Sequence, residues 1–151
     1  MKRNRWMFAV AVAFLLGMAP MLSAQVTLPI SATTSVTGTV AVEIPFRFSL
    51  EGKTFRSGTY VISPLTDRTI SLHESKGKDR QNLVVMTYPV VAVNNVSGPK
   101  LIFHRYGDDY FLTQAWLRQS DSGREFPVSP DEIRMARQYK QDQVILVAKS
   151  K

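Results

Sequence analysis

The sequence has no cysteine and only two histidines, His73 and His104. The absence of cysteine excludes disulfide bonds, thiolate metal sites, catalytic thiols and a lipid-modified N-terminal cysteine. No metal-binding motif joins the two histidines, and the glycines are isolated rather than grouped in a phosphate-binding loop. The residues therefore predict no metal and no cofactor, and the fold must be stabilised by its hydrophobic core alone.

Long apolar runs are also scarce, and the one at the N-terminus has the features of a secretory signal peptide. Three basic residues precede an apolar run over residues 7–22, which Gly17 and Pro20 interrupt, and the small residue Ala24 follows. We expect residues 1–24 to be removed, which predicts an exported protein, periplasmic or extracellular. An uncleaved anchor is the alternative, but the run is shorter than the roughly 20 apolar residues of a spanning helix. No stable membrane anchor is expected after cleavage.

The charge pattern does not indicate a nucleic-acid partner. Loss of residues 1–24 removes three of the 19 Lys and Arg and none of the 12 Asp and Glu, leaving 16 basic against 12 acidic residues, a net charge of +4. The one local basic cluster, residues 76–80, is interrupted by Asp79 and is typical of a solvated turn. A nucleic-acid interface needs a basic stripe with stacking aromatics, and the sequence has none.

Residues 36–50 carry the strongest periodic signal. Apolar or small residues occupy every even position, and the odd positions are mostly polar. The even positions hold Val36, Gly38, Val40, Val42, Ile44, Phe46, Phe48 and Leu50. This alternation predicts a strand with one buried face, and Pro45 predicts an edge, a bulge or a break because proline cannot donate to a ladder. The preceding residues 25–35 are small and polar, and we expect a flexible lead-in there.

Turn-rich intervals separate further strand signals along the chain. These lie at residues 54–63, 68–73, 82–93, 100–106, 110–118 and 143–148, with a loop expected at 119–125. Residues 82–93 are apolar at both parities, so we expect both faces of that segment to be covered, and Pro89 predicts that it divides into two short strands.

One helix signal interrupts the strands near the C-terminus. Ser129 is expected as its N-cap, Pro130 as its first residue and Glu132 as the partner in a capping box. Ile133 and Ala136 begin an apolar repeat at helical spacing that continues to residue 139 or 140. The predicted fold class is all-β: an antiparallel sandwich or a small barrel of about eight or nine strands with one short C-terminal helix, formed by residues 36–151.

Three stretches together resemble a known family. They are "VEIPFRFSLEGKTFRSGTYVIS", "LIFHRYGDDYFLTQAW" and "SPDEIRMARQ". The Pro-Phe-x-Phe and Gly-Thr-Tyr pattern, the Phe-His-Arg-Tyr-Gly hairpin and the Ser-x-x-Glu helix start resemble a family of small exported bacterial β proteins of unknown function, over most of residues 36–148. Residues 55–57 are Phe-Arg-Ser where that family tends to have Leu-Pro-Ala. The resemblance implies export and a small β domain, and it implies no activity, cofactor or catalytic residue.

The hairpin over residues 100–117 contains the side chains most suited to chemistry. The candidate ligand-binding residues are His104, Arg105, Tyr106, Asp108, Asp109 and Trp116. In a functional interpretation His104 is a general base that an aspartate orients. In a structural interpretation the residues around Gly107 form a hairpin turn, His104 bonds to its neighbours and Arg105 pairs with an acidic residue. We favour the structural interpretation because no nucleophile motif accompanies the histidine, and we expect Trp116 in the core rather than on a sugar-stacking surface.

Three functions remain open from the sequence. The leading hypothesis is an exported, non-enzymatic β module that acts by binding or as an envelope component, with an unknown partner and with sheet edges available for pairing. The second is a small barrel that holds an apolar ligand against the inward row of residues 40–50. The third is an enzyme built on His104 with Arg105, Asp108 and Asp109.

Overall fold

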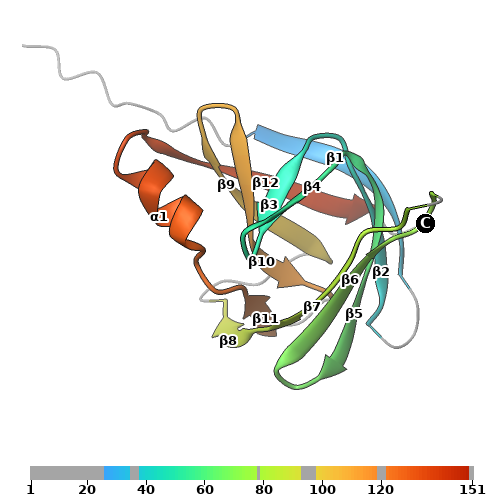
Figure 1. Ribbon diagram of the computed structural model, residues 1–151. Helices are drawn as coiled ribbons and strands as arrows, with labels where there is room; N and C mark the ends of the chain where they lie inside the picture. Colours follow the sequence, from blue (N-terminus) through green and yellow to red (C-terminus); the bar gives the residue numbers. More distant parts are fainter. Residues whose placement is uncertain (1–25, 35–37, 78, 93–97, 119–121, 150–151) are drawn as a thin grey trace, which may run out of the picture.

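The computed structural model describes residues 26–34, 38–77, 79–92, 98–118 and 122–149. Within them the chain forms twelve strands and one short helix, which confirms the predicted all-β fold class (Figure 1). The predicted signal segment, residues 1–24, lies outside the described residues. No helix in the described part of the chain is both long and apolar enough to cross a membrane.

The strands form two sheets that share the first strand. In chain order the elements are β1 (Val26–Thr34), β2 (Val40–Ile44), β3 (Phe48–Leu50), β4 (Lys53–Phe55), β5 (Gly58–Thr66), β6 (Thr69–Glu74), β7 (Asn82–Met86), β8 (Tyr88–Val91), β9 (Lys100–Tyr106), β10 (Asp109–Trp116), β11 (Ser122–Glu125), α1 (Pro130–Ala136) and β12 (Gln141–Lys149). The first sheet has the order β4-β3-β10-β9-β12-β1, and β10 also pairs with β11, which pairs with β8. The second sheet has the order β1-β2-β5-β6-β7.

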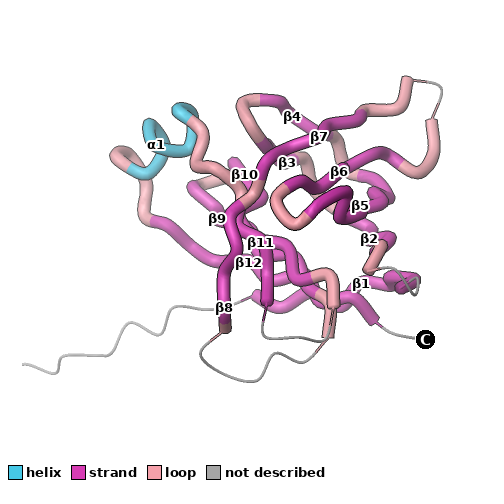
Figure 2. Tube along the Cα trace, turned by 90° about the horizontal axis from the view of Figure 1, so that it is seen from below, coloured by secondary structure: helices cyan, strands magenta, loops and turns pink. Residues whose placement is uncertain are grey.

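β1 connects the sheets because its two halves pair with different strands. Residues 26–31 pair in parallel with β12, and residues 32–34 pair antiparallel with β2. The end strands of the whole order, β4 and β7, do not pair with each other. The architecture is therefore a sandwich, and the alternative prediction of a closed barrel was wrong. In both Figure 1 and Figure 2, α1 lies beside the first sheet on the side away from β5 and β6.

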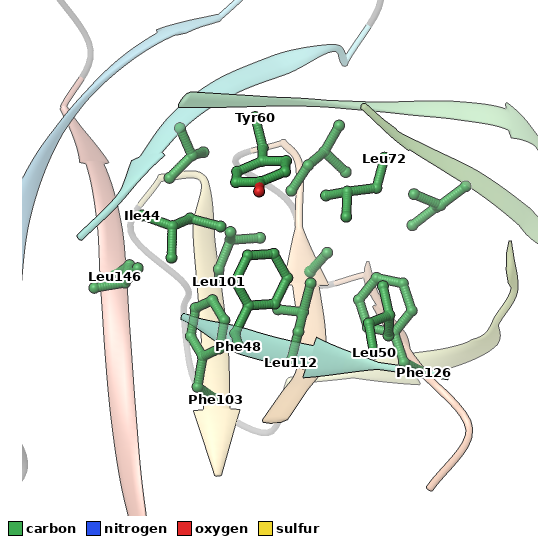
Figure 3. Packing of buried hydrophobic residues seen from close by; sticks show 14 of the residues in the cluster. Ile44, Phe48, Leu50, Tyr60, Leu72, Leu101, Phe103, Leu112, Phe126 and Leu146 are labelled. Carbon is green, nitrogen blue, oxygen red and sulfur yellow. The ribbon is translucent and has the colours of Figure 1, made fainter. Parts of the chain in front are cut away.

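The core lies between the sheets and is filled by side chains (Figure 3). Phe48 has its ring centroid 5.1 Å from that of Phe55, 5.3 Å from that of Tyr60 and 5.7 Å from that of Phe103. Burying an aromatic side chain of this kind stabilises a fold by roughly 1.5–3 kcal/mol. The other even positions of residues 40–50 are buried in the same cluster, apart from the half-buried Phe46. The inward row proposed as the wall of a ligand barrel is thus packed core.

Several predicted strands differ from the observed ones in their ends. Pro45 ends β2 as expected, and the chain then crosses from the second sheet to β3 in the first. Residues 54–63 likewise divide into β4 and β5, which lie in different sheets. Residues 26–34, expected to be a flexible lead-in, form β1 because β12 and β2 supply backbone partners. These divisions and additions explain why the described residues contain more strands than expected.

Residues 122–125, where we expected a loop, form β11. A close contact with Trp116 explains why this strand contains Gly123. A Cβ atom at Gly123 would lie 2.6 Å from the Trp116 ring, so only glycine fits there. Trp116 is buried with Ile102 in a small second cluster, as predicted, and its Nε1 donates to Gln114 Oε1 at 3.2 Å. Trp116 therefore offers no open ring face for stacking on a sugar.

A buried carboxylate fastens the β4–β5 connection to the β6–β7 hairpin. Arg56 donates from Nε to Glu74 Oε1 at 3.0 Å and from Nη2 to Glu74 Oε2 at 2.9 Å. These hydrogen bonds lower the pKa of Glu74 below its ordinary value, although burial opposes them. Tyr60 donates its hydroxyl to the Arg56 carbonyl at 2.7 Å, and burial raises the pKa of Tyr60 to about 12.

The lowered pKa of Glu74 predicts acid sensitivity. The folded protein binds the proton on Glu74 less tightly than the unfolded chain does, so protonation favours unfolding. The stabilisation is fully present above the unfolded-state pKa of about 4.3 and is lost as the pH falls through the lower folded-state pKa. We expect the melting temperature to fall more between about pH 6 and pH 3 in the native protein than in the Glu74→Gln variant. Equal pH dependence of the two proteins, measured by circular dichroism, would contradict this assignment.

Candidate functional site

His104 and Tyr106 lie on the outer face of the first sheet. Strand β9 places alternate side chains on opposite faces, so Leu101 and Phe103 enter the core while His104 and Tyr106 point the other way. The sequence predicted this division of the strand. The outer face at this position is met by α1, the single helix of the described residues.

Glu132 of α1 is the partner of His104. The Nδ1 atom of His104 lies 2.8 Å from Glu132 Oε1, and the Glu132 side chain is only 6 % exposed against 26 % for His104. Ser129 caps the helix as predicted, because its Oγ accepts from the Glu132 N–H at 3.2 Å. The Glu132 carboxylate, expected to complete a capping box, is directed to the histidine.

Tyr106 extends this polar cluster toward β12. Its hydroxyl donates to Gln141 Oε1 at 3.2 Å, and its ring lies edge-on to the His104 ring at 6.3 Å. Burial, followed by the nearby charge of Glu132, raises the pKa of Tyr106. The cluster of His104, Tyr106, Glu132 and Gln141 therefore joins β9, α1 and β12.

The two aspartates of the hairpin take no part in this cluster. Arg105 Nε donates to the Gly107 carbonyl at 2.7 Å, and an Arg105 Nη2 atom lies 3.9 Å from Asp108 Oδ1. Gly107 has a φ of +62°, which the β9–β10 turn requires. Asp109 is exposed opposite Tyr106 in the register. In the described part of the chain, no hydrogen bond or ion pair joins either aspartate to His104.

The hairpin interpretation fits these contacts, and the orienting aspartate of the catalytic interpretation was wrong. His104 is fixed by a glutamate from a distant helix, a partner that spacing within the hairpin does not reveal. The described residues contain no group of three or more His, Asp or Glu side chains that could hold a metal ion. A groove of about 510 Å³ is lined by other residues, at the ends of β5 and β10, and His104 is not among them. The His104–Glu132 pair is thus placed to fasten α1 to the sheet.

α1 is fastened by this polar contact rather than by the predicted apolar stripe. Glu132 is the one buried residue of the helix. Ile133 and Ala136, which begin the predicted apolar repeat, are exposed, as is Tyr139 beyond the helix. Seven residues present too few side chains to cover a sheet, and the buried carboxylate takes the inward position instead.

Residues 82–91 form an exposed apolar segment, although both of their faces were expected to be covered. Four side chains of this segment are between 60 and 70 % exposed. They are Val84, Met86, Tyr88 and Val91. Among the strands that the structure describes, β7 pairs only with β6. The chain then turns at the buried Thr87 and continues as β8, which pairs with β11. The segment divides into two short strands as predicted, but it does so at Thr87 rather than at Pro89, which lies inside β8. The apolar run marks an edge strand rather than a covered one.

No family model, curated protein or solved structure matches the chain. The family resemblance of the three sequence stretches stays a prediction. The function is therefore argued from the surfaces and contacts described above.

The polar fastening of α1 predicts an energetic coupling between His104 and Glu132. Hydrogen bonds to charged groups contribute about 1.5–3 kcal/mol to folding. In a double-mutant cycle with His104→Gln and Glu132→Gln, we expect a coupling of that order in the free energy of urea unfolding. Hydrogen exchange should rise in residues 129–137 of either single variant and stay unchanged in β2. Additive effects of the two substitutions, with α1 equally protected in both, would refute the role given to this pair.

Proposed function

We propose that the protein is an exported β-sandwich that acts by binding a partner polypeptide at residues 82–91. The observation that carries this proposal is the exposure of four large apolar side chains within β7 and β8. Monomeric soluble proteins rarely expose apolar patches larger than a few hundred Å², and patches of that size mark interaction sites.

The segment also lacks charge. None of residues 82–91 is Asp, Glu, Lys or Arg, so no ionic group must be desolvated when a partner covers it. Proteins usually protect an edge strand with charged residues, and β7 has none. Pro89, in β8, is the one residue of the segment that limits strand pairing, because it has no N–H.

β7 also presents unpaired backbone groups. Glu74 N donates to the Gln81 carbonyl at 2.8 Å, and Thr87 N donates to the Arg68 carbonyl at 2.7 Å. Bonded residues alternate along an antiparallel pair, so odd-numbered residues from Gln81 to Thr87 bond to β6 and even-numbered ones face away. The residues that face away are Asn82, Val84 and Met86. Among the described residues no strand pairs with them, which leaves their N–H and C=O groups available to a partner strand.

β4, the strand at the other end of the sheet order, differs from β7 in each respect. It has three residues and carries the exposed Lys53. The side-chain amide of Gln81 accepts from Arg56 N at 3.3 Å and donates to Thr54 O at 3.1 Å. The Gln81 side chain thus bonds to backbone groups beside β4, whereas no described side chain bonds to the outer backbone groups of Val84 and Met86. This contrast supports β7 as the edge that meets a partner.

Export is the second part of the proposal, and the N-terminal sequence supports it. The basic start, the apolar run and Ala24 are the parts of a cleavable signal peptide. The absence of cysteine is compatible with an oxidising compartment because no thiol is exposed to mispairing. The partner would then lie outside the cytoplasm, and the protein would act either as an envelope component or as a secreted module.

The proposed contact surface predicts a site-specific cross-link. A photoreactive residue at Val84 should capture a partner polypeptide in living cells of the native host, because this position is exposed in the middle of the free edge. The matched control is the same residue at Val128, which is 56 % exposed but belongs to the segment before α1. Capture at Val84 that Met86→Lys abolishes supports the proposal. Equal capture at both positions, or at neither, would rule out β7 as the binding edge.

Export predicts a defined N-terminus. In the native host, the protein isolated from outside the cytoplasm should begin at Gln25, which intact-mass measurement and N-terminal sequencing detect. Replacing Ala24 with Arg should block cleavage, because signal cleavage needs a small residue there. A protein that retains Met1 and fractionates with the cytoplasm would exclude the export half of the proposal.

A further inference from the structure

A groove at one end of the sandwich is lined by apolar and basic side chains, and none of its lining residues belongs to the segment 82–91. Its volume is about 510 Å³, within the range of small-molecule sites. One wall is the end of β5 and its turn to β6, and the other is formed by the end of β10 and by β11. In Figure 1 the β5–β6 turn lies at the lower end of the molecule, close to β11.

The floor of the groove is part of the hydrophobic core. Ala115 and Leu117 line the groove and belong to the same buried cluster as Phe48. Leu65, on the opposite wall, is 55 % exposed. An apolar chain that lay between these three side chains would remove Leu65 from water and cover the floor, which favours binding through burial of apolar surface.

The polar part of the groove has an excess of positive charge. Among the described residues that line it, Arg118 and Arg124 are accompanied by one acidic residue, Asp67. Arg124 is half-buried, and in the described part of the chain it forms neither an ion pair nor a side-chain hydrogen bond. Its guanidinium nitrogens therefore reach water, because the described residues contain no buried side-chain nitrogen without a partner. A bound carboxylate or phosphate would replace that water with two acceptor oxygens.

The register of β11 places this cation beside the apolar floor. Arg124 is opposite Ala115 in the β10–β11 pair. A ligand that bonded to Arg124 with an anionic head would therefore have the start of its chain over Ala115. The ligand chain would then continue past Leu117 to Leu65 on the opposite wall.

We propose that this groove binds a single-chain amphipathic anion, with its carboxylate or phosphate head on Arg124 and its alkyl chain over Ala115 and Leu117. The ligand class is an acyl chain with one acidic head, which a free fatty acid and a monoacyl phospholipid share. The proposal needs neither export nor a partner at β7, so it stands or falls independently of the proposed function.

Calorimetric titration of the purified protein tests this proposal. The probes are dodecanoate, dodecyl phosphate and dodecyltrimethylammonium, each below its micelle concentration. We expect saturable binding of at least one anion and none of the cation. Dodecanoate as the tighter ligand would indicate a fatty acid, and dodecyl phosphate would indicate a phospholipid head. Failure of both anions to bind, or equal binding of the cation, would overturn the proposal.

Two variants and a control assign the site. Arg124→Gln should weaken anion binding by about tenfold or more, because a charge-assisted hydrogen bond is lost. Leu65→Asp changes an exposed residue on the rim, so it keeps the test valid if Arg124→Gln unfolds. It should also weaken binding by placing a negative charge beside the chain. Arg137→Gln removes an exposed arginine outside the groove and should bind as the native protein does. Unchanged affinity in both groove variants would show that the anion binds elsewhere.

Discussion

The packing of Phe48 against Phe55, Tyr60 and Phe103 joins the two sheets, because Tyr60 comes from the second sheet and the other three rings come from the first. This contact exists because alternate residues point inward on both sides of Pro45, while the chain passes from β2 in one sheet to β3 in the other. A shift of one residue in either strand would turn the whole inward row to solvent. The register of both sheets therefore depends on this alternation.

Two buried carboxylates connect further elements of the fold. Glu74 fastens the β6–β7 hairpin to Arg56, and Glu132 fastens α1 to His104. Both carboxylates have partners that satisfy them, and the described residues contain no buried side-chain polar atom without a hydrogen bond. Such pairs specify one arrangement of the elements, because removing either partner leaves a buried charge uncompensated. The chemically suggestive side chains of the β9–β10 hairpin are part of this structural system.

The sequence predicted the features that depend on neighbours along the chain. Period-two alternation located the strands, Pro45 located a break, and Ser129 with Pro130 located the start of the helix. The features that failed depend on distant residues. β1 and β11 need partner strands that local composition does not show, and Gly123 is explained only by the ring of Trp116 above it.

The candidate sites also depend on distant residues that the local sequence does not show. Glu132 was recognised as a helix-capping residue, but its contact with His104 spans 28 positions of sequence. The apolar run of residues 82–93 was interpreted as a covered strand, since composition alone does not distinguish a strand between two layers from an exposed edge. The sequence does not indicate that Arg124 is half-buried in a groove, because the groove is formed by β5, β10 and β11 together.

The proposed function requires one side of β7 to be an open edge. Backbone amide hydrogen exchange, resolved residue by residue by NMR on the isolated protein, tests it most directly. We expect an alternating pattern, in which the amides of Leu83 and Val85 exchange slowly because they bond to β6, while those of Val84 and Met86 exchange quickly. If the amides of Val84 and Met86 were as protected as those of Leu83 and Val85, the edge would already be paired, and the proposed binding surface would be contradicted.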